Sequence, residues 1–276
     1  MIFVNQEKIE FKNFNDGSFR VKYEVDSEGQ HSNVLWLYDG AIEALQLWYL
    51  IKHIHERVPD QIIDLEMPYC CDARMDRCQN RDEVFTLKYF ADLLNALPLH
   101  SVKVFDPHSH VCEALINRLV VETPIHNLHL MSELYPKAIW FFPDAGAEKR
   151  YGPMVPNKLS CFGVKHRDWD TQEIHDLSIF GATQFIKNND IIICDDIVSR
   201  GSTLYSAAKQ LKELGANNIY VYVSHCEDTV LQPHINRKSL LDYDLITKLY
   251  TTNSIYRAEH PKINVIETFL GGKVNA

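Results

Sequence analysis

Short runs of β-branched and aromatic residues alternate along this chain with longer segments in which apolar residues recur at helical spacing. Each short run ends in a polar or acidic cluster, a pattern typical of strands and helices that alternate around a largely parallel sheet. The pattern therefore predicts an α/β fold. The expected strands are 34–38, 62–65, 102–105, 138–142, 159–164, 190–194 and 218–223, and the expected helices are 41–57, 83–96 and 203–214.

The alternation of strands and helices occurs twice, which indicates two similar lobes joined near residues 125–137. We place the first lobe at 1–128 and the second at 129–261. An exposed hairpin is expected over 11–25, around Asn15-Asp16-Gly17, because such a sequence favours a tight reversal between strands. One more strand is expected at 263–269, and the C-terminal segment 262–276 is a candidate for rejoining the first lobe.

Composition and charge limit the classes of protein and of partner that this sequence can represent. The 276 residues carry a formal net charge of −9, with 24% charged and 46% hydrophobic residues. This balance is that of a folded globular protein, and the negative charge disfavours nucleic acid and anionic membrane surfaces as partners. Seven cysteines without a C-x-x-C pair indicate reduced thiols rather than a zinc site. The chain begins without a signal sequence and contains no run of about 18 apolar residues, so we expect a cytoplasmic protein.

The strongest candidate site follows the apolar run that ends at Cys194. Asp195 and Asp196 come directly after this run, and a loop of small residues then opens the helix expected at 203–214. Ligands of open α/β sheets bind at the carboxyl ends of central strands, and a helix N-terminus attracts phosphate. Two carboxylates suit a pair of ribose hydroxyls, although the same pair is also compatible with a capped turn or a metal site. The candidate phosphate ligands are Ser199, Arg200, Gly201, Ser202 and Thr203.

This loop resembles the phosphoribosyl diphosphate signature of type I phosphoribosyltransferase folds, and further motifs narrow the resemblance to the ribose-phosphate diphosphokinases. The matching segments occur in the order of that family. They are 13–18 (F-x-D-G-E in the family), 68–77 (P-Y-x-x-x-A-R-Q-D-R), 82–86 (G-E-A-I-S), 105–110 (D-L-H-A), 142–146 (S-P-D-A-G) and 165–167 (K-x-R). The resemblance implies two tandem type I phosphoribosyltransferase-like lobes, each a mostly parallel sheet flanked by helices.

The resemblance also implies a reaction: transfer of the β,γ-diphosphate of Mg-ATP to the anomeric 1-hydroxyl of ribose 5-phosphate, with release of AMP. Lys165 and Arg167 would act as catalytic cations, and His108 and Asp144 would hold Mg²⁺ directly or through water. Without the family match, a structural histidine is the better interpretation of His108. A homo-oligomer is implied as well, because the F-x-D-G loop of the family completes the ATP site of a neighbouring subunit. The implied ATP-binding residues are Phe14, Asp16, Arg74, Asp76, Arg77 and His108.

The chain departs from the family pattern at both substrates. The family loop reads D-T-G-G-T, and Arg200 here introduces a permanent charge that suits an extended phosphate group. ADP-ribose, the acceptor of divergent phage-encoded relatives in NAD synthesis, is therefore an alternative to ribose 5-phosphate. Ser18 and Met75 replace the usual glutamate and glutamine at the ATP motifs. Two other functions remain open: a phosphoribosyltransferase that makes a nucleotide, and a regulatory family member without catalysis.

Overall fold

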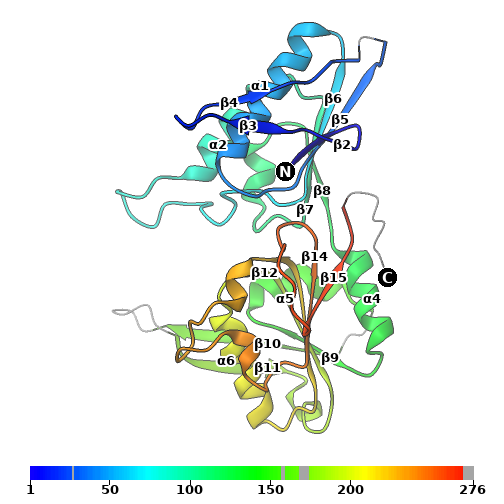
Figure 1. The fold of residues 1–276 in the computed structure, drawn as a ribbon. Helices are drawn as coiled ribbons and strands as arrows, with labels where there is room; N and C mark the ends of the chain where they lie inside the picture. Colours follow the sequence, from blue (N-terminus) through cyan, green and yellow to red (C-terminus); the bar gives the residue numbers. More distant parts are fainter. Residues whose placement is uncertain (27, 157–158, 168–173, 270–276) are drawn as a thin grey trace. The chain divides into compact units, whose positions relative to one another are not determined.

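The computed structural model describes residues 1–26, 28–156, 159–167 and 174–269, and for 165–167 and 174–177 it describes the backbone alone (Figure 1). These residues form two compact units. The first comprises Met1–Thr123 together with Phe269, and the second comprises the described part of Pro124–Thr268. Both units combine a mostly parallel sheet with helices, which confirms the expected α/β class.

The first unit contains a six-stranded sheet in the order β2-β1-β5-β6-β7-β8. The four strands β5 to β8 run parallel, and β1 and β2 complete the edge in antiparallel pairing. A separate hairpin joins β3 and β4, at the place where the sequence predicts one. The strands are β1 Ile2–Val4, β2 Glu7–Lys8, β3 Phe11–Asn13, β4 Phe19–Val21, β5 His31–Trp36, β6 Ile62–Met67, β7 Ser101–Phe105 and β8 Leu119–Glu122.

Helices α1 (Ile42–Arg57), α2 (Thr86–Asn95) and α3 (Val111–Leu115) belong to the first unit. Side chains alternate along each strand, so that Ile63 and Leu65 of β6 enter the core with Leu50 of α1, whereas Asp64 between them does not. The main core of this unit therefore occupies the helix-bearing face of its sheet, and Cys70, Cys71 and Ala73 of the loop after β6 extend it.

The second unit contains a seven-stranded sheet in the order β11-β10-β9-β12-β13-β14-β15. All neighbouring pairs are parallel except β10 with β11. The strands are β9 Ile139–Phe142, β10 Ser160–Arg167, β11 Ile174–Gly181, β12 Ile191–Val198, β13 Ile219–Cys226, β14 Lys248–Thr252 and β15 Ile263–Ile266. The helices are α4 Ile125–Leu134, α5 Ala145–Tyr151 and α6 Ser202–Glu213, with short 3-10 turns at Gly152–Met154, Thr183–Phe185, Asp228–Leu231 and Leu240–Asp242.

Strand β12 is central because both of its faces are buried. Ile191 and Ile193 pack with Leu211 of α6 on one face, and Ile192 and Cys194 pack with α4 and α5 residues on the other. This arrangement explains the uninterrupted apolar run in the sequence, since a strand covered on both faces needs no polar alternation. It also places the residues that follow Cys194 at the carboxyl edge of the sheet.

Several boundaries differ from the sequence-based expectations. Residues 125–134 form helix α4 rather than a plain connection, and β8, β11 and β14 were not foreseen. The final strand, β15, pairs with β14 in the second sheet and does not return to the first. Phe269, three residues later, does pack in the first unit, where its ring lies 5.2 Å from that of Phe105. No helix among the described residues has the length and apolarity needed to cross a bilayer.

Candidate functional site

The loop between β12 and α6 is held in a backbone conformation that only glycine tolerates well. Gly201 has φ = +80° and directly precedes the first residue of α6. A β-carbon at this position would lie 2.6 Å from Leu240 Cδ2, so the chain here approaches a fully buried leucine. No side chain caps the helix at Gly201, and Ser202 is exposed at its first turn. The open N–H groups and the helix dipole make this turn suitable for an anion.

The hydroxyl of Ser199 is held by residues that follow the neighbouring strand β13. Ser199 Oγ donates to Glu227 Oε2 at 2.7 Å and lies 3.1 Å from Thr229 Oγ1, which itself donates to Glu227 at 2.9 Å. Glu227 therefore anchors the start of the loop and adds a carboxylate beside it. The sequence-based reasoning missed this residue, although a carboxylate just after a strand adjacent to β12 was a usable signal.

Three carboxylates interact at the carboxyl edges of the adjacent strands β9 and β12. Asp196 is buried, and its N–H donates to Asp195 Oδ1 at 3.0 Å. Burial, followed by repulsion from Asp196 and Asp144, raises the pKa of Asp195 well above its usual range. Asp144 also caps α5 by accepting the Ala147 N–H at 2.9 Å. Bound hydroxyls or a divalent cation would relieve the repulsion among these groups.

The expected metal ligands do not form a preassembled cage. Among the residues that the structure describes, no group of three or more His, Cys, Asp or Glu side chains is arranged to hold a metal ion. His108 and Asp144 belong to different units, and each is exposed or half-exposed at the end of its own strand. The oxygen donors of Asp144 and Asp195 still suit Mg²⁺, which takes few protein ligands and keeps several waters.

Lys165 and Arg167, the expected catalytic cations, lie in β10, which continues past the strand end expected at residue 164. Strand β10 pairs with β9 on one side and with β11 on the other, and the register shifts between His166 and Arg167. The side chains of both residues lie outside what the structure describes.

Arg200 is exposed and makes no ion pair with any described residue. Its guanidinium therefore does not stabilise the described part of the fold through an ion pair.

In the first unit, the loops after β6 and β7 lie together. The Phe105 N–H donates to Pro68 O at 3.2 Å, which joins the end of β7 to the start of the 68–77 loop. Asp76 is buried and receives two hydrogen bonds from Arg77, Nε to Oδ1 at 2.7 Å and Nη2 to Oδ2 at 2.8 Å. This bidentate contact is the main cause that lowers the pKa of Asp76, and Ser109 and His108 add to it. Arg74, Arg77 and His108 are exposed beside it.

The β3–β4 turn carries the remaining candidates. Phe14 is 57% exposed, and its backbone is closed by a 2.7 Å hydrogen bond from its N–H to Ser18 O. Ser18 donates through both Oγ and N–H to Asp16 Oδ1, at 2.7 Å and 3.0 Å, and these bonds lower the pKa of Asp16. The residue that replaces the family glutamate therefore stabilises the turn. The exposed phenylalanine ring is left free to stack on a flat ligand.

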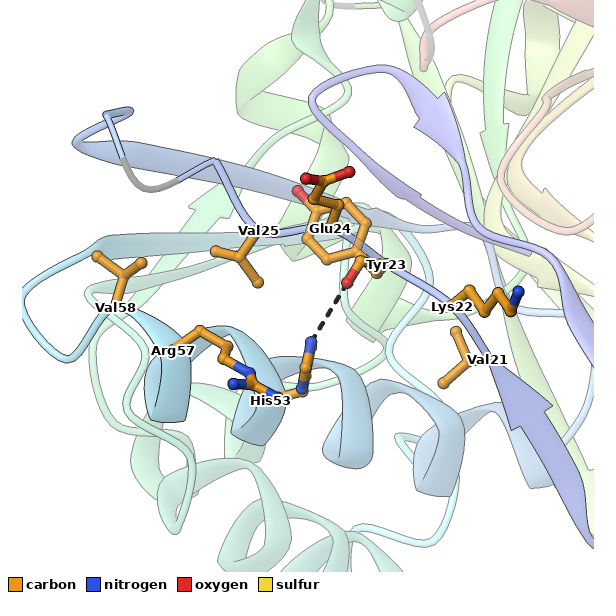
Figure 2. Close-up of a pocket in the computed structure, with 8 residues that line it drawn as sticks. All are labelled: Val21, Lys22, Tyr23, Glu24, Val25, His53, Arg57 and Val58. Carbon is orange, nitrogen blue, oxygen red and sulfur yellow. Dashed lines mark hydrogen bonds between the residues drawn. The ribbon is translucent and has the colours of Figure 1, made fainter.

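A cavity of about 750 Å³ lies in the first unit. It is bordered by the segment 21–25 and by the C-terminal end of α1, and Figure 2 shows the His53 ring directed at the main chain of Tyr23, 3.3 Å from its carbonyl oxygen. None of the residues that the sequence analysis selected lines this cavity. Its volume alone therefore does not make it the functional site.

Curated proteins similar to this chain include ribose-phosphate pyrophosphokinases. No family model matches it. Ribose-phosphate pyrophosphokinase 1 of Listeria monocytogenes is 24% identical over 266 residues, covering 92% of this chain and 79% of that protein. Ribose-phosphate pyrophosphokinase of Helicobacter hepaticus is 27% identical over 218 residues, covering 74% of this chain and 65% of that protein. The resemblance recognised in the motifs is thus confirmed over most of the chain.

Among solved structures, phosphoribosylpyrophosphate synthetase from Mycobacterium smegmatis matches with a TM-score of 0.77 at 19% identity. The match covers 94% of this chain and 85% of that structure. At this level of identity the likeness speaks for the fold. It confirms the expected arrangement of two tandem phosphoribosyltransferase-like lobes.

Proposed function

We propose that this chain, as a distant member of the ribose-phosphate diphosphokinase family, is an enzyme that transfers the β,γ-diphosphate of ATP to the anomeric hydroxyl of a ribose 5-phosphate moiety and releases AMP. The observation that carries the proposal is the carboxyl end of β12, where two carboxylates are followed by a glycine-containing turn at the N-terminus of α6. This combination matches the two ends of a ribose phosphate.

In this proposal the acceptor is held by the second unit. Asp195 and Asp196 accept hydrogen bonds from the ribose hydroxyls, which relieves the repulsion that raises the pKa of Asp195. The N–H groups and hydroxyls of residues 199–203 hold the 5-phosphate at the helix N-terminus. Glu227 positions the loop through Ser199. Such a reaction depends on positioning and charge neutralisation more than on covalent chemistry.

The nucleotide is assigned to residues of the first unit, with Phe14 and Asp16 for the adenosine part and Arg74, Arg77 and His108 for the phosphates. Asp76 serves mainly to orient Arg77, because its carboxylate is already engaged in the bidentate contact. Mg²⁺, with His108 and Asp144 as its proposed protein ligands, supplies charge neutralisation at the phosphates when bound. A homo-oligomer in which the Phe14 turn serves a neighbouring subunit is part of the proposal.

Lys165 and Arg167 would stabilise the charge that develops on the transferred diphosphate. Removal of one preorganised donor of this kind costs about 3 kcal/mol of transition-state stabilisation, which is on the order of a hundredfold in rate. We expect Lys165→Ala to lower AMP release by this factor. Lys187→Ala is the matched control, because Lys187 is exposed and precedes β12, at the opposite end of that strand from Asp195. An undiminished rate in Lys165→Ala refutes the assignment.

The chemical identity of the acceptor is a separate part of the proposal. Arg200 is exposed on the phosphate loop and is unpaired within the described residues, so it is available to a second phosphate, as in ADP-ribose. We propose ADP-ribose, giving ADP-ribose 1-diphosphate for NAD synthesis, as the alternative to ribose 5-phosphate. AMP release is measured with each acceptor in parallel, for the wild type and for Arg200→Thr. ATP binding without AMP release from either acceptor indicates a regulatory protein instead.

A further inference from the structure

Two buried cysteines are in contact next to the loops assigned to ATP. Cys112 Sγ lies 3.8 Å from Cys70 Sγ, and both residues are almost fully buried. Cys70 belongs to the loop after β6, and Cys112 is the second residue of α3, 42 positions later. Both belong to the first unit. Neither thiol has a role in the proposed phosphate chemistry.

We propose that Cys70 and Cys112 form a redox-sensitive pair, which a small disulfide such as glutathione disulfide converts into an intramolecular disulfide that ties the loop after β6 to α3.

The step is a two-electron oxidation of the protein. The thiolate of one cysteine attacks a sulfur of glutathione disulfide, forms a mixed disulfide and releases one glutathione thiolate. The second cysteine then attacks the protein sulfur of the mixed disulfide and releases the second glutathione. The protein loses two thiol protons, which the two glutathione thiolates take up. The oxidant is reduced to two glutathione molecules, so atoms and electrons balance.

The fold brings the two segments that carry the cysteines together. A hydrogen bond from the Phe105 N–H to Pro68 O joins the end of β7 to the start of the 68–77 loop, and Cys112 follows β7 by seven residues. A disulfide has an S–S distance of about 2.05 Å, so the sulfur atoms need to approach by less than about 2 Å. Rotation of the side chains with a small shift of α3 provides a movement of this size.

Access to the thiols requires local opening, and α3 is suited to it. This helix has five residues, and the hydrogen bond from the Cys112 N–H to Ser109 O is long, at 3.4 Å. His108 and His110 before it are exposed. Short segments with few backbone hydrogen bonds open at lower free energy than the whole domain. We therefore expect the pair to oxidise more slowly than the exposed Cys78, and to do so without global unfolding.

The cross-link has a consequence for nucleotide binding that rests on the proposed function. Asp76 and His108 lie on the two segments that the disulfide joins, and a hydrogen bond from Ser109, the residue after His108, reaches Asp76. Drawing α3 toward the 68–77 loop changes the position of these groups relative to each other. A displacement of about 1 Å in positioned groups costs up to a hundredfold, so we expect oxidation to raise the KM for ATP by roughly tenfold, reversibly.

The test uses the full chain with Cys78→Ser, which removes the exposed thiol. The protein is incubated in glutathione buffers of graded ratio, digested without reduction, and examined by mass spectrometry for the peptide pair that joins Cys70 to Cys112. The control adds Cys112→Ser, for which we expect a glutathione adduct at most and no cross-link. Circular dichroism before and after oxidation verifies that the protein remains folded.

A Cys70–Cys112 peptide that appears with oxidant and disappears with dithiothreitol supports the proposal, as does a parallel rise in the KM for ATP. Absence of the cross-link in folded protein, even with pure glutathione disulfide, overturns it, and so does a cross-link that joins Cys112 to Cys71 instead. A cross-link with an unchanged KM for ATP overturns the effect on nucleotide binding. Failure of the reduced protein to release AMP contradicts the proposed function, while mass spectrometry still decides the cysteine pair.

Discussion

Gly201→Ala tests whether the phosphate loop depends on the contact between its backbone and Leu240. With φ = +80°, any residue with a β-carbon at this position is strained by about 1–2 kcal/mol. The added β-carbon would also lie 2.6 Å from Leu240 Cδ2 and 3.0 Å from Leu240 Cβ, far inside the normal contact distance of about 3.5–4.0 Å. Leu240 is fully buried, so it cannot retreat into solvent, and such overpacking costs about 1–3 kcal/mol more.

Gly215→Ala separates the two contributions. Gly215 lies in the same unit with φ = +87°, and its added β-carbon would approach Lys187 Cγ, at 3.2 Å, on an exposed and flexible side chain. We expect this control to lose about 1–2 kcal/mol and Gly201→Ala to lose about 2–5 kcal/mol. Urea unfolding followed by circular dichroism measures both. Equal losses for the two variants would show that Leu240 does not confine the loop.

Three further predictions concern the proposed substrates. Glu227→Ala removes the hydrogen-bond partner of Ser199 and Thr229, so we expect a higher KM for the acceptor with little change in the KM for ATP. Steady-state AMP release with each substrate varied in turn measures both constants. An equal change in both KM values contradicts the prediction. Asp195→Asn removes a carboxyl group whose pKa is raised in the folded protein. The contribution of this group to the stability of the wild type is therefore largest below the unfolded pKa of about 3.9 and falls as the pH rises toward the folded pKa. The melting temperature of this variant should exceed that of the wild type at pH 7.5 and converge with it near pH 4, and a pH-independent difference would be inconsistent with this cause. Phe14→Ala should change the free energy of unfolding by less than about 0.5 kcal/mol, because Phe14 is exposed, yet it should raise the KM for ATP. Unchanged ATP kinetics would show that Phe14 is not part of the nucleotide site.

The elements that sequence reasoning located best are those whose pattern is local. The apolar run at 191–194 and the helical period after 202 are decided by neighbouring residues, and both elements exist within a few positions of the expectation. Strand β11 and helix α4 were missed. In α4 only Asn127, Leu128 and Met131 are buried, so the apolar stripe that would have indicated a helix is weak. For β15, the choice of partner depends on the exposed edge of β14, which no pattern within residues 263–269 encodes.

The sequence by itself determined the two-lobed α/β architecture and the run from Asp195 to Thr203, because a strand, a turn and a helix N-terminus follow one another within a dozen residues. Only the tertiary structure decided which distant groups complete that run. Glu227 accepts a hydrogen bond from Ser199, 28 positions earlier, and Leu240 packs against Gly201. Asp144, at the end of the adjacent strand, repels Asp195 and raises its pKa. The Cys70–Cys112 contact spans 42 positions in the same way. Such contacts depend on strand order and on the packing of loops at one edge of a sheet, and local periodicity carries no information about either.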